Sequence, residues 1–191
     1  QNCFVNGPRI LFTRPAKPQI LIVARQPLER RQVAWLILAA TVVAALTAAA
    51  FLPPFLDASA GNIIMAGFSK VCHQLPDRSF HIHGEQIALC HRCVGIYAAI
   101  PPAILVYTGL RRWDSLVARH PVAVVALSLV PLAVDWGADA IGLWTNTPAS
   151  RLATGAFFGI AAGYLLARGI VNAVAEGAQV ANQTSTRHAA T

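Results

Sequence analysis

The sequence predicts an all-α integral membrane protein, a four-helix transmembrane bundle with an extracytoplasmic loop that contains cysteines and histidines. Three observations predict this fold class: 55% of the 191 residues are hydrophobic, only 12% are charged, and the mean hydropathy is +0.53. An ordinary soluble domain carries about 25% charged residues, so this chain has too few polar side chains to cover a soluble surface. The abundance of apolar residues also excludes intrinsic disorder.

Four apolar runs are expected to cross the membrane as helices, since a span of about 30 Å takes roughly 20 residues. They are residues 33–52, 94–110, 121–144 and 152–175. The first run carries no charge and stops at Pro53, and Pro101 and Pro102 predict a kink within the second. Pro121 is a favourable first residue for the third helix. Arg168, near the end of the fourth run, can extend its charged head to the membrane surface.

The basic residues predict the orientation, because Lys and Arg concentrate on the cytoplasmic side of membrane proteins. Eleven of the fifteen fall on one side of the predicted spans and four on the other. The eleven are Arg9, Arg14, Lys17, Arg25, Arg30, Arg31, Arg111, Arg112, Arg119, Arg168 and Arg187, and the four are Lys70, Arg78, Arg92 and Arg151. We therefore expect a multi-pass plasma-membrane protein with both termini in the cytoplasm and the loop 57–93 outside.

The chain is expected to divide into three parts. Residues 1–32 form a poorly ordered cytoplasmic segment, residues 33–175 the four-span membrane domain, and residues 176–191 a disordered tail. Residues 1–24 lack the basic region, apolar core and cleavage site of a secretory signal. The net charge of +7 lies mostly beside the apolar runs rather than in a basic stripe, so the expected partner is the lipid bilayer and not nucleic acid.

Three glycines, Gly155, Gly159 and Gly163, place small residues along one face of the fourth predicted helix. Small faces let membrane helices approach one another closely. Packing against another helix of the same chain is the favoured interpretation of this face. Homodimerisation through the three glycines is the alternative.

Cysteine and histidine are concentrated in the loop between the first two spans. Seven of the ten such residues in the chain lie there: Cys72, His73, His81, His83, Cys90, His91 and Cys93. The two-residue gap between Cys90 and Cys93 lets both thiolates face one ion, and Gly95 is expected to permit a tight turn behind them. The pattern is typical of a zinc knuckle.

A short hairpin is predicted over residues 80–90, with Gly84 at its turn. In an extended strand His81, His83 and Glu85 would share one face. Either histidine is therefore a possible metal ligand, because His73 is adjacent to Cys72 and simultaneous ligation by neighbours is awkward.

Three explanations of the cysteines are open. A zinc site could use Cys72, Cys90, Cys93 and one imidazole as a tetrahedral set. A membrane thiol–disulfide oxidoreductase could cycle the Cys90–Cys93 pair and pass electrons to a quinone. A structural disulfide is the third explanation. Cysteine parity favours the metal, because Cys3 is predicted on the opposite side of the membrane, and three outer thiols cannot make the two pairs of a relay.

Two carboxylates, Asp135 and Asp139, lie four residues apart in the third predicted span and share one helix face. A carboxylate within a span is costly and is by default a functional candidate. Both lie toward the outer end, so they are candidate catalytic residues, as a base or as a partner of a metal ligand. The alternatives are an interfacial Asp139, with Arg151 neutralising one carboxylate, and a path for a cation or proton.

A longer pattern of residues resembles a known family. The pattern is Cys72-His73-Gln74-x-Pro76-x-Arg78-Ser79-Phe80, Gly84, Cys90-x-Arg92-Cys93-x-Gly95-Ile96-Tyr97, Asp135-Trp136, Arg151 and Thr154-Gly155. It is similar to that of bacterial and archaeal membrane proteins grouped as domain of unknown function 2085, over about residues 66–165. The resemblance implies a small multispanning membrane protein of unassigned activity. His73 belongs to the family pattern and His81, His83 and His91 do not, which favours His73 as the fourth metal ligand.

Overall fold

The structure is a computed structural model that describes residues 27–111 and 114–189. Four of its helices are long and apolar enough to cross a membrane, which confirms the four predicted spans. They are α2 (Arg30–Ala49), α4 (His91–Leu110), α6 (Pro121–Ala140) and α7 (Pro148–Ala189). The shorter elements are η1 (Pro53–Phe55), α3 (Ala58–Phe68), η2 (Pro76–Arg78), β1 (Ser79–Ile82), β2 (Glu85–Cys90) and α5 (Asp114–Arg119).

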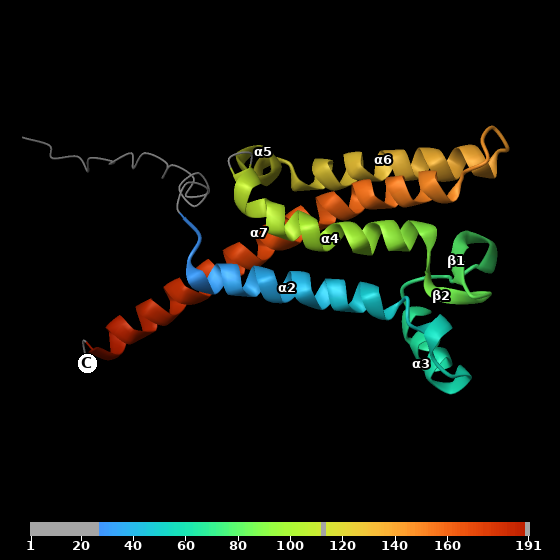
Figure 1. Ribbon diagram of the computed structural model, residues 1–191. Coiled ribbons are helices and arrows are strands. Elements are labelled where there is room, and N and C mark those ends of the chain that lie inside the picture. Colours follow the sequence, from blue (N-terminus) through green and yellow to red (C-terminus); the bar gives the residue numbers. More distant parts are fainter. Residues whose placement is uncertain (1–26, 112–113, 190–191) are drawn as a thin grey trace, which may run out of the picture.

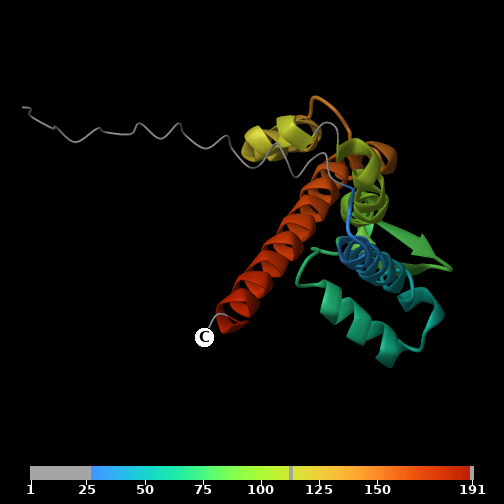
Figure 2. The same cartoon turned by 90° about the vertical axis from the view of Figure 1, so that its left-hand side faces the viewer.

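The four long helices lie side by side, with the β1–β2 hairpin and α3 at one end and α5 at the other (Figure 1). We call these the hairpin end and the α5 end. Helices α4 and α7 both begin at the hairpin end and run in parallel, whereas α2 and α6 run in the opposite direction. Helix α2 packs on both α4 and α7, and α6 packs on α7, so the α4–α7 pair is the centre of the bundle. Figure 2 shows α7 inclined to α2.

The glycine face of α7 packs against α4. An added Cβ would lie 2.2 Å from a carbonyl oxygen of α4 at Gly155, 2.3 Å at Gly159 and 2.7 Å at Gly163. Only a hydrogen in place of Cβ permits backbones to approach this closely. The favoured interpretation, packing within one chain, therefore agrees with the structure. Because α4 covers the three glycines, they are not exposed for the alternative, contact with a second copy of the chain.

Gly95 contributes to the same contact from the other side. An added Cβ there would lie 2.2 Å from the carbonyl oxygen of Leu152 in α7. Gly95 is a helical residue of α4. The expected tight turn behind the cysteines is therefore wrong, and Gly95 instead lets the start of α4 meet the start of α7.

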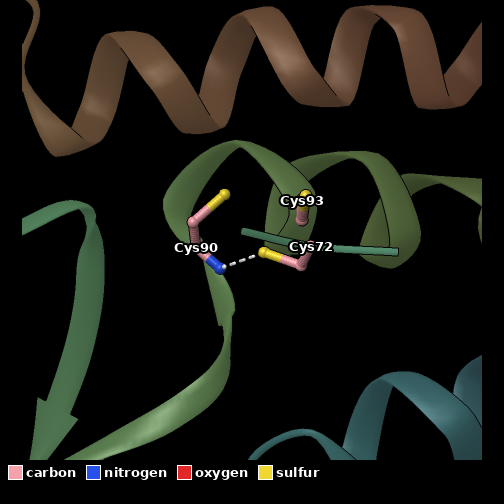
Figure 3. A group of neighbouring side chains, drawn as sticks. All are labelled: Cys72, Cys90 and Cys93. Carbon is pink, nitrogen blue, oxygen red and sulfur yellow. Dashed lines mark hydrogen bonds between the residues drawn. The ribbon is translucent and has the colours of Figure 1, made fainter. Parts of the chain in front are cut away.

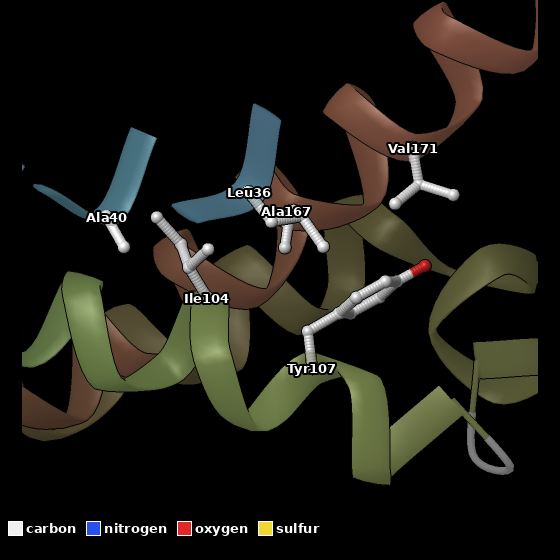
Figure 4. Packing of buried hydrophobic residues seen from close by; sticks show 6 residues of the cluster. All are labelled: Leu36, Ala40, Ile104, Tyr107, Ala167 and Val171. Carbon is white, nitrogen blue, oxygen red and sulfur yellow. The ribbon is translucent and has the colours of Figure 1, made fainter. Parts of the chain in front are cut away.

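The core between α2, α4 and α7 is a compact apolar cluster (Figure 4). Its buried members are Leu36, Ala40, Ile104, Tyr107, Ala167 and Val171. The Gln32 side chain donates to the carbonyl oxygen of Val171 at 3.2 Å and so ties α2 to α7. A second buried cluster at the hairpin end includes Ile87, Leu89 and Val94. Many other apolar side chains are exposed; Val122 and Leu127 of α6 are 80% and 68% exposed. Such a surface is expected where lipid is the solvent.

The helix boundaries differ from the predicted runs. Helix α6 ends at Ala140 rather than residue 144, because a turn with Gly142 at a φ of 72° follows it. Helix α4 continues through Pro101 and Pro102. The disordered tail predicted for 176–191 is wrong over residues 176–189, which extend α7 as helix. This segment contains no proline and is rich in alanine and glutamine, which favour helix. Most of the predicted N-terminal segment, residues 1–26, lies outside the described residues.

The predicted loop 57–93 contains regular secondary structure. It begins with α3, an eleven-residue helix whose N-cap Asp57 accepts a hydrogen bond from the Ala60 amide at 3.0 Å. The predicted hairpin is confirmed as the antiparallel pair β1–β2. The predicted shared face is wrong, because His83 lies in the turn at a φ of 53° and Glu85 pairs with Ile82 across it.

Candidate metal centre

Three cysteines converge at the hairpin end, where β2 passes into α4. Cys90 is the last residue of β2 and the N-cap of α4, and Cys93 lies in the first turn of that helix. Cys72 comes from the loop after α3 and is 5% exposed. The three sulfur atoms lie within 4.8 Å of one another, and all three residues are free thiols. Figure 3 shows the side chains gathered at the start of α4. We call this group the thiol cluster.

Gln74 fixes the position of the Cys72 loop. Its backbone is in the left-handed region at a φ of 52°, which turns the chain sharply after Cys72. Its side-chain amide donates to the carbonyl oxygens of Met65 at 2.8 Å and Ala88 at 3.0 Å, and its own carbonyl accepts from Gln86 at 2.8 Å. Gln74 thus joins α3, the loop and β2. This role is not evident from the sequence, although Gln74 stands in the Cys-His-Gln motif.

Hydrogen bonding favours a thiolate at the start of α4. The amide of Cys90 donates to the sulfur of Cys72 at 3.2 Å (Figure 3). Side-chain hydrogen bonds with Cys72 and then Cys93 hold the pKa of the Cys90 thiol far below its ordinary value, against the opposing effect of burial. The thiolate is the form of cysteine that binds metals and attacks disulfides, so Cys90 is ready for either chemistry at neutral pH.

The structure does not bring a histidine into the thiol cluster. The predicted fourth ligand, His73, is exposed and lies outside the group of ligand atoms within 4.8 Å, and His81 and His83 are exposed as well. His91 is buried and packs edge-on against Phe80 with ring centroids 4.4 Å apart. His73 nevertheless lines the same cleft as Cys90 and Cys93. Three of the four predicted ligands therefore come together.

The two carboxylates of α6 take part in a polar network rather than joining the thiol cluster. Asp135 is 8% exposed, forms an ion pair with Arg92, and accepts a hydrogen bond from the Asn146 side chain at 3.3 Å. Asp139 accepts from the backbone amide of Asn146 at 3.2 Å. Arg151 donates to the Asn146 side-chain oxygen at 2.6 Å. The residue that neutralises a carboxylate is therefore Arg92 and not Arg151 as predicted.

This network bears on both hypotheses for the carboxylates. Asp135 pairs with Arg92, which stands between Cys90 and Cys93 in the sequence. A transport path requires carboxylates that exchange a cation or proton, whereas Asp135 is bound to a guanidinium and an amide. The geometry thus makes Asp135 a residue that positions Arg92, and Asn146 is the polar link that the sequence analysis missed.

A cleft of about 260 Å³ opens beside the thiol cluster. Its walls include Cys90 and Cys93, His73, Trp136 and three arginines, Arg78, Arg92 and Arg151. These residues come from the loop before β1 and from α4, α6 and α7. The cleft gives small molecules access to the thiols from the hairpin end.

Together these features define a class: a helical, multispanning membrane protein with a three-thiol cluster and a basic cleft at one end of its bundle. A family model described as predicted membrane protein (DUF2085) matches residues 72–165, the segment that carries the cysteine motifs. A similar protein is an uncharacterized protein of Methanocaldococcus jannaschii, 34% identical over 92 residues. The match covers 48% of this chain and 58% of that protein. No solved structure matches the chain.

Proposed function

We propose that the thiol cluster is a metal site and that zinc is the ion it holds. The observation that carries the proposal is the convergence of three sulfurs within 4.8 Å at a partly buried position, with an amide donating to one of them. Zinc binds thiolates at about 2.3 Å in a tetrahedron, which sets the sulfurs roughly 3.8 Å apart. Closing the cluster to that size takes shifts on the order of 1 Å. Soft thiolates disfavour magnesium and calcium, which prefer oxygen ligands.

His73 is our candidate for the fourth ligand. It follows Cys72 directly and lines the cleft that borders Cys90 and Cys93. A change of its side-chain rotamer would be needed to bring the imidazole to the ion. A four-coordinate site of three cysteines and one histidine is a common structural zinc site. On this proposal the ion ties the α3 loop to the start of α4.

The proposed orientation puts the thiol cluster on the extracytoplasmic side of the plasma membrane. Residues 27 and 189, the outer limits of the described chain, both belong to segments that lie toward the α5 end, as an even number of spans requires (Figure 1). The excess of basic residues on that side supports a cytoplasmic location. Reporter fusions at residues 60 and 115 test this, and fusions that report the same side would contradict it.

Metal content is the direct test of the zinc proposal. Full-length protein purified in detergent without added metal is expected to contain about one zinc per chain by elemental analysis. Cys72→Ser, Cys90→Ser and Cys93→Ser should each remove most of it. Cys3→Ser is the matched control, because it also removes a thiol and should leave the zinc content unchanged. Metal-free protein with three unpaired thiols at the cluster would contradict this proposal.

Chelation gives a second, structural measurement. Because ligand thiolates bind the ion only when the loop is folded around it, removing zinc should loosen the hairpin end. Hydrogen exchange within residues 72–93 is expected to accelerate on addition of a strong chelator, while exchange in α5 stays the same. Equal acceleration at both ends would indicate general unfolding, and no change would contradict a structural ion.

The second candidate function is thiol–disulfide exchange with a quinone. Two observations favour it: the lowered pKa of Cys90 at a helix start, and an apolar cavity of about 520 Å³ lined by Phe68, Tyr97 and Ile100. Oxidation of the Cys90 thiolate and the Cys93 thiol to a disulfide would release two electrons and one proton, which together with a second proton from water reduce a quinone to the quinol. Protein without metal and with a Cys90–Cys93 disulfide after purification would replace the zinc proposal with this one.

A further inference from the structure

The cleft beside the thiol cluster is unusually rich in cations. Arg78, Arg92 and Arg151 reach it from three separate elements, and His73 lies at the same cleft. No Asp or Glu lines it among residues 27–111 and 114–189. Buried or half-buried guanidinium groups are costly unless an anion accompanies them. Whether the protein itself supplies enough anions for these arginines therefore bears on whether the cleft binds an anionic ligand.

The protein supplies one buried carboxylate for the three arginines. Asp135, with a side chain 7% exposed, is paired with Arg92. Asp77 lies 3.5 Å from Arg78 Nε, but its side chain is 72% exposed and solvent weakens such a pair. Arg151 donates to Asn146, which is neutral. The cleft thus keeps an excess of positive charge after its protein partners are counted.

Two of these arginines also have an unused donor. The Nε atoms of Arg78 and Arg92 are buried and have no hydrogen-bond acceptor within the part of the chain that the structure describes. Buried polar atoms without a partner are rare in folded proteins. The Nε of Arg78 lies beside the exposed Asp77 carboxylate, whereas the Nε of Arg92 has no acceptor among the described residues. The planar guanidinium fork matches the oxygens of phosphate and carboxylate groups.

The thiolates could account for part of this charge. Three thiolates around a divalent ion carry a net charge of about −1, which offsets one guanidinium. Arg92 is already neutralised by Asp135, so Arg78 and Arg151 share that single charge. An additional anion is still favoured, because the N–H donors of a guanidinium are arranged to bind two oxygen atoms, and the thiolate sulfurs do not supply these acceptors.

We propose that this cleft binds a phosphate-type oxyanion, held by Arg78, Arg92 and Arg151. Its volume of about 260 Å³ lies just below the range of about 300–1,000 Å³ for drug-sized ligands, so a group of headgroup size fits. Trp136 stands in the wall and is 56% exposed, a placement typical of the membrane–water interface. The source of the oxyanion is either free phosphate or the phosphodiester of an anionic lipid.

Titration with inorganic phosphate tests the site. Full-length protein in phosphatidylcholine nanodiscs is titrated by calorimetry, and its zinc content is measured on the same samples. Arg78→Gln, which leaves the Asp135–Asn146 network intact, should weaken phosphate binding at least tenfold, and Arg78→Lys should weaken it less. Arg119→Gln removes the same charge at the α5 end and should leave the affinity unchanged.

A second experiment distinguishes the two sources. Protein is reconstituted with phosphatidylglycerol, and retained lipid is counted by native mass spectrometry. A lipid ligand predicts that wild type retains phosphatidylglycerol, that Arg78→Gln loses it, and that phosphate competes with it. Retention of no lipid together with phosphate binding identifies a free anion as the ligand.

Three outcomes would overturn the proposal. Neither phosphate nor phosphatidylglycerol binds, or Arg119→Gln weakens binding as much as Arg78→Gln does. The third is that Arg78→Gln loses zinc while its phosphate affinity is unchanged, which would show that the arginines serve only the thiolate charge. Because the anion is measured separately from zinc, a metal-free protein that binds phosphate would contradict the zinc site and still support this one.

Discussion

Both ends of the bundle hold a buried pair of arginine and aspartate, and the two pairs are built differently. At the α5 end, Nε of Arg168 lies 3.1 and 3.3 Å from the carboxylate oxygens of Asp114, and the Tyr164 hydroxyl donates to the same group at 3.4 Å. The ion pair there joins Arg168 to Asp114. At the hairpin end, Asp135 pairs with Arg92 in a cleft that holds two more arginines.

The difference shows that burial of an ion pair does not by itself indicate function. The Arg168–Asp114 pair joins α5 to α7 with its charges matched and its acceptors occupied. It is adequately explained as a structural contact. The hairpin end has three arginines and two of the three thiols at one cleft, and these features support the proposal of a ligand from outside the chain.

The largest expected effects come from removing the carboxylate at each end. Asp135→Asn and Asp114→Asn should each lower the free energy of unfolding by about 3 kcal/mol, because each leaves a buried guanidinium unpaired. Only Asp135→Asn should tighten phosphate binding, several-fold, since it frees Arg92 in the cleft. Unfolding in detergent and phosphate titration measure the two effects. Equal changes in phosphate affinity in Asp135→Asn and Asp114→Asn would contradict the proposed difference between the two ends.

A smaller effect is expected along the contact between α4 and α7, where the two backbones approach closely at Gly155 but not at Gly169. Gly155→Ala should cost about 2 kcal/mol of stability, because its Cβ would lie 2.2 Å from a carbonyl oxygen. Gly169→Ala is the matched control in the same helix, with nothing within 4 Å of the added Cβ. It should stabilise the protein by up to about 1 kcal/mol through helix propensity. A neutral Gly155→Ala would mean that α7 does not approach α4 this closely.

The smallest effect is expected for the alkylation rate of Cys90, which should change little with pH. Because hydrogen bonds with Cys72 and Cys93 lower the pKa of Cys90, its thiolate persists as the pH falls below the ordinary range for a thiol. In metal-free protein, the rate at which iodoacetamide alkylates Cys90 should change less than about twofold between pH 9 and pH 6. A thiol with an ordinary pKa of about 8.5 slows by roughly two orders of magnitude over that interval. Mass spectrometry of quenched samples measures the rate, and an ordinary decline would contradict the lowered pKa.

Sequence patterns predicted what depends on local spacing. Hydropathy identified the four spans, and the gap between Cys90 and Cys93 placed two thiols at one helix start. The hairpin followed from Gly84. Helix α3 was missed because its eleven residues, two of them glycine, are too few for a span, and its helix depends on the Asp57 cap and packing at the hairpin end.

Partners far apart in sequence could not be predicted. Arg92 and Asp135 are separated by 43 residues, and nothing local shows which arginine a carboxylate in α6 will meet. The role of Gln74 depends on three carbonyl and amide partners from α3 and β2. The failure to bring His73 into the cluster follows from a rotamer and a backbone turn, which the motif does not encode.

The positions of the thiols in the sequence determine when during synthesis the thiol cluster is complete. Cys72, Cys90 and Cys93 lie within 22 consecutive residues, whereas Arg151 follows Cys93 by 58 residues. At roughly 5–20 residues per second, synthesis completes the thiol cluster about 3–12 seconds before Arg151 is added. All three thiols are therefore synthesised before α7, the helix that closes the cleft. A metal could bind the thiol cluster while the cleft is still open, whereas the anion site forms only when the bundle is complete.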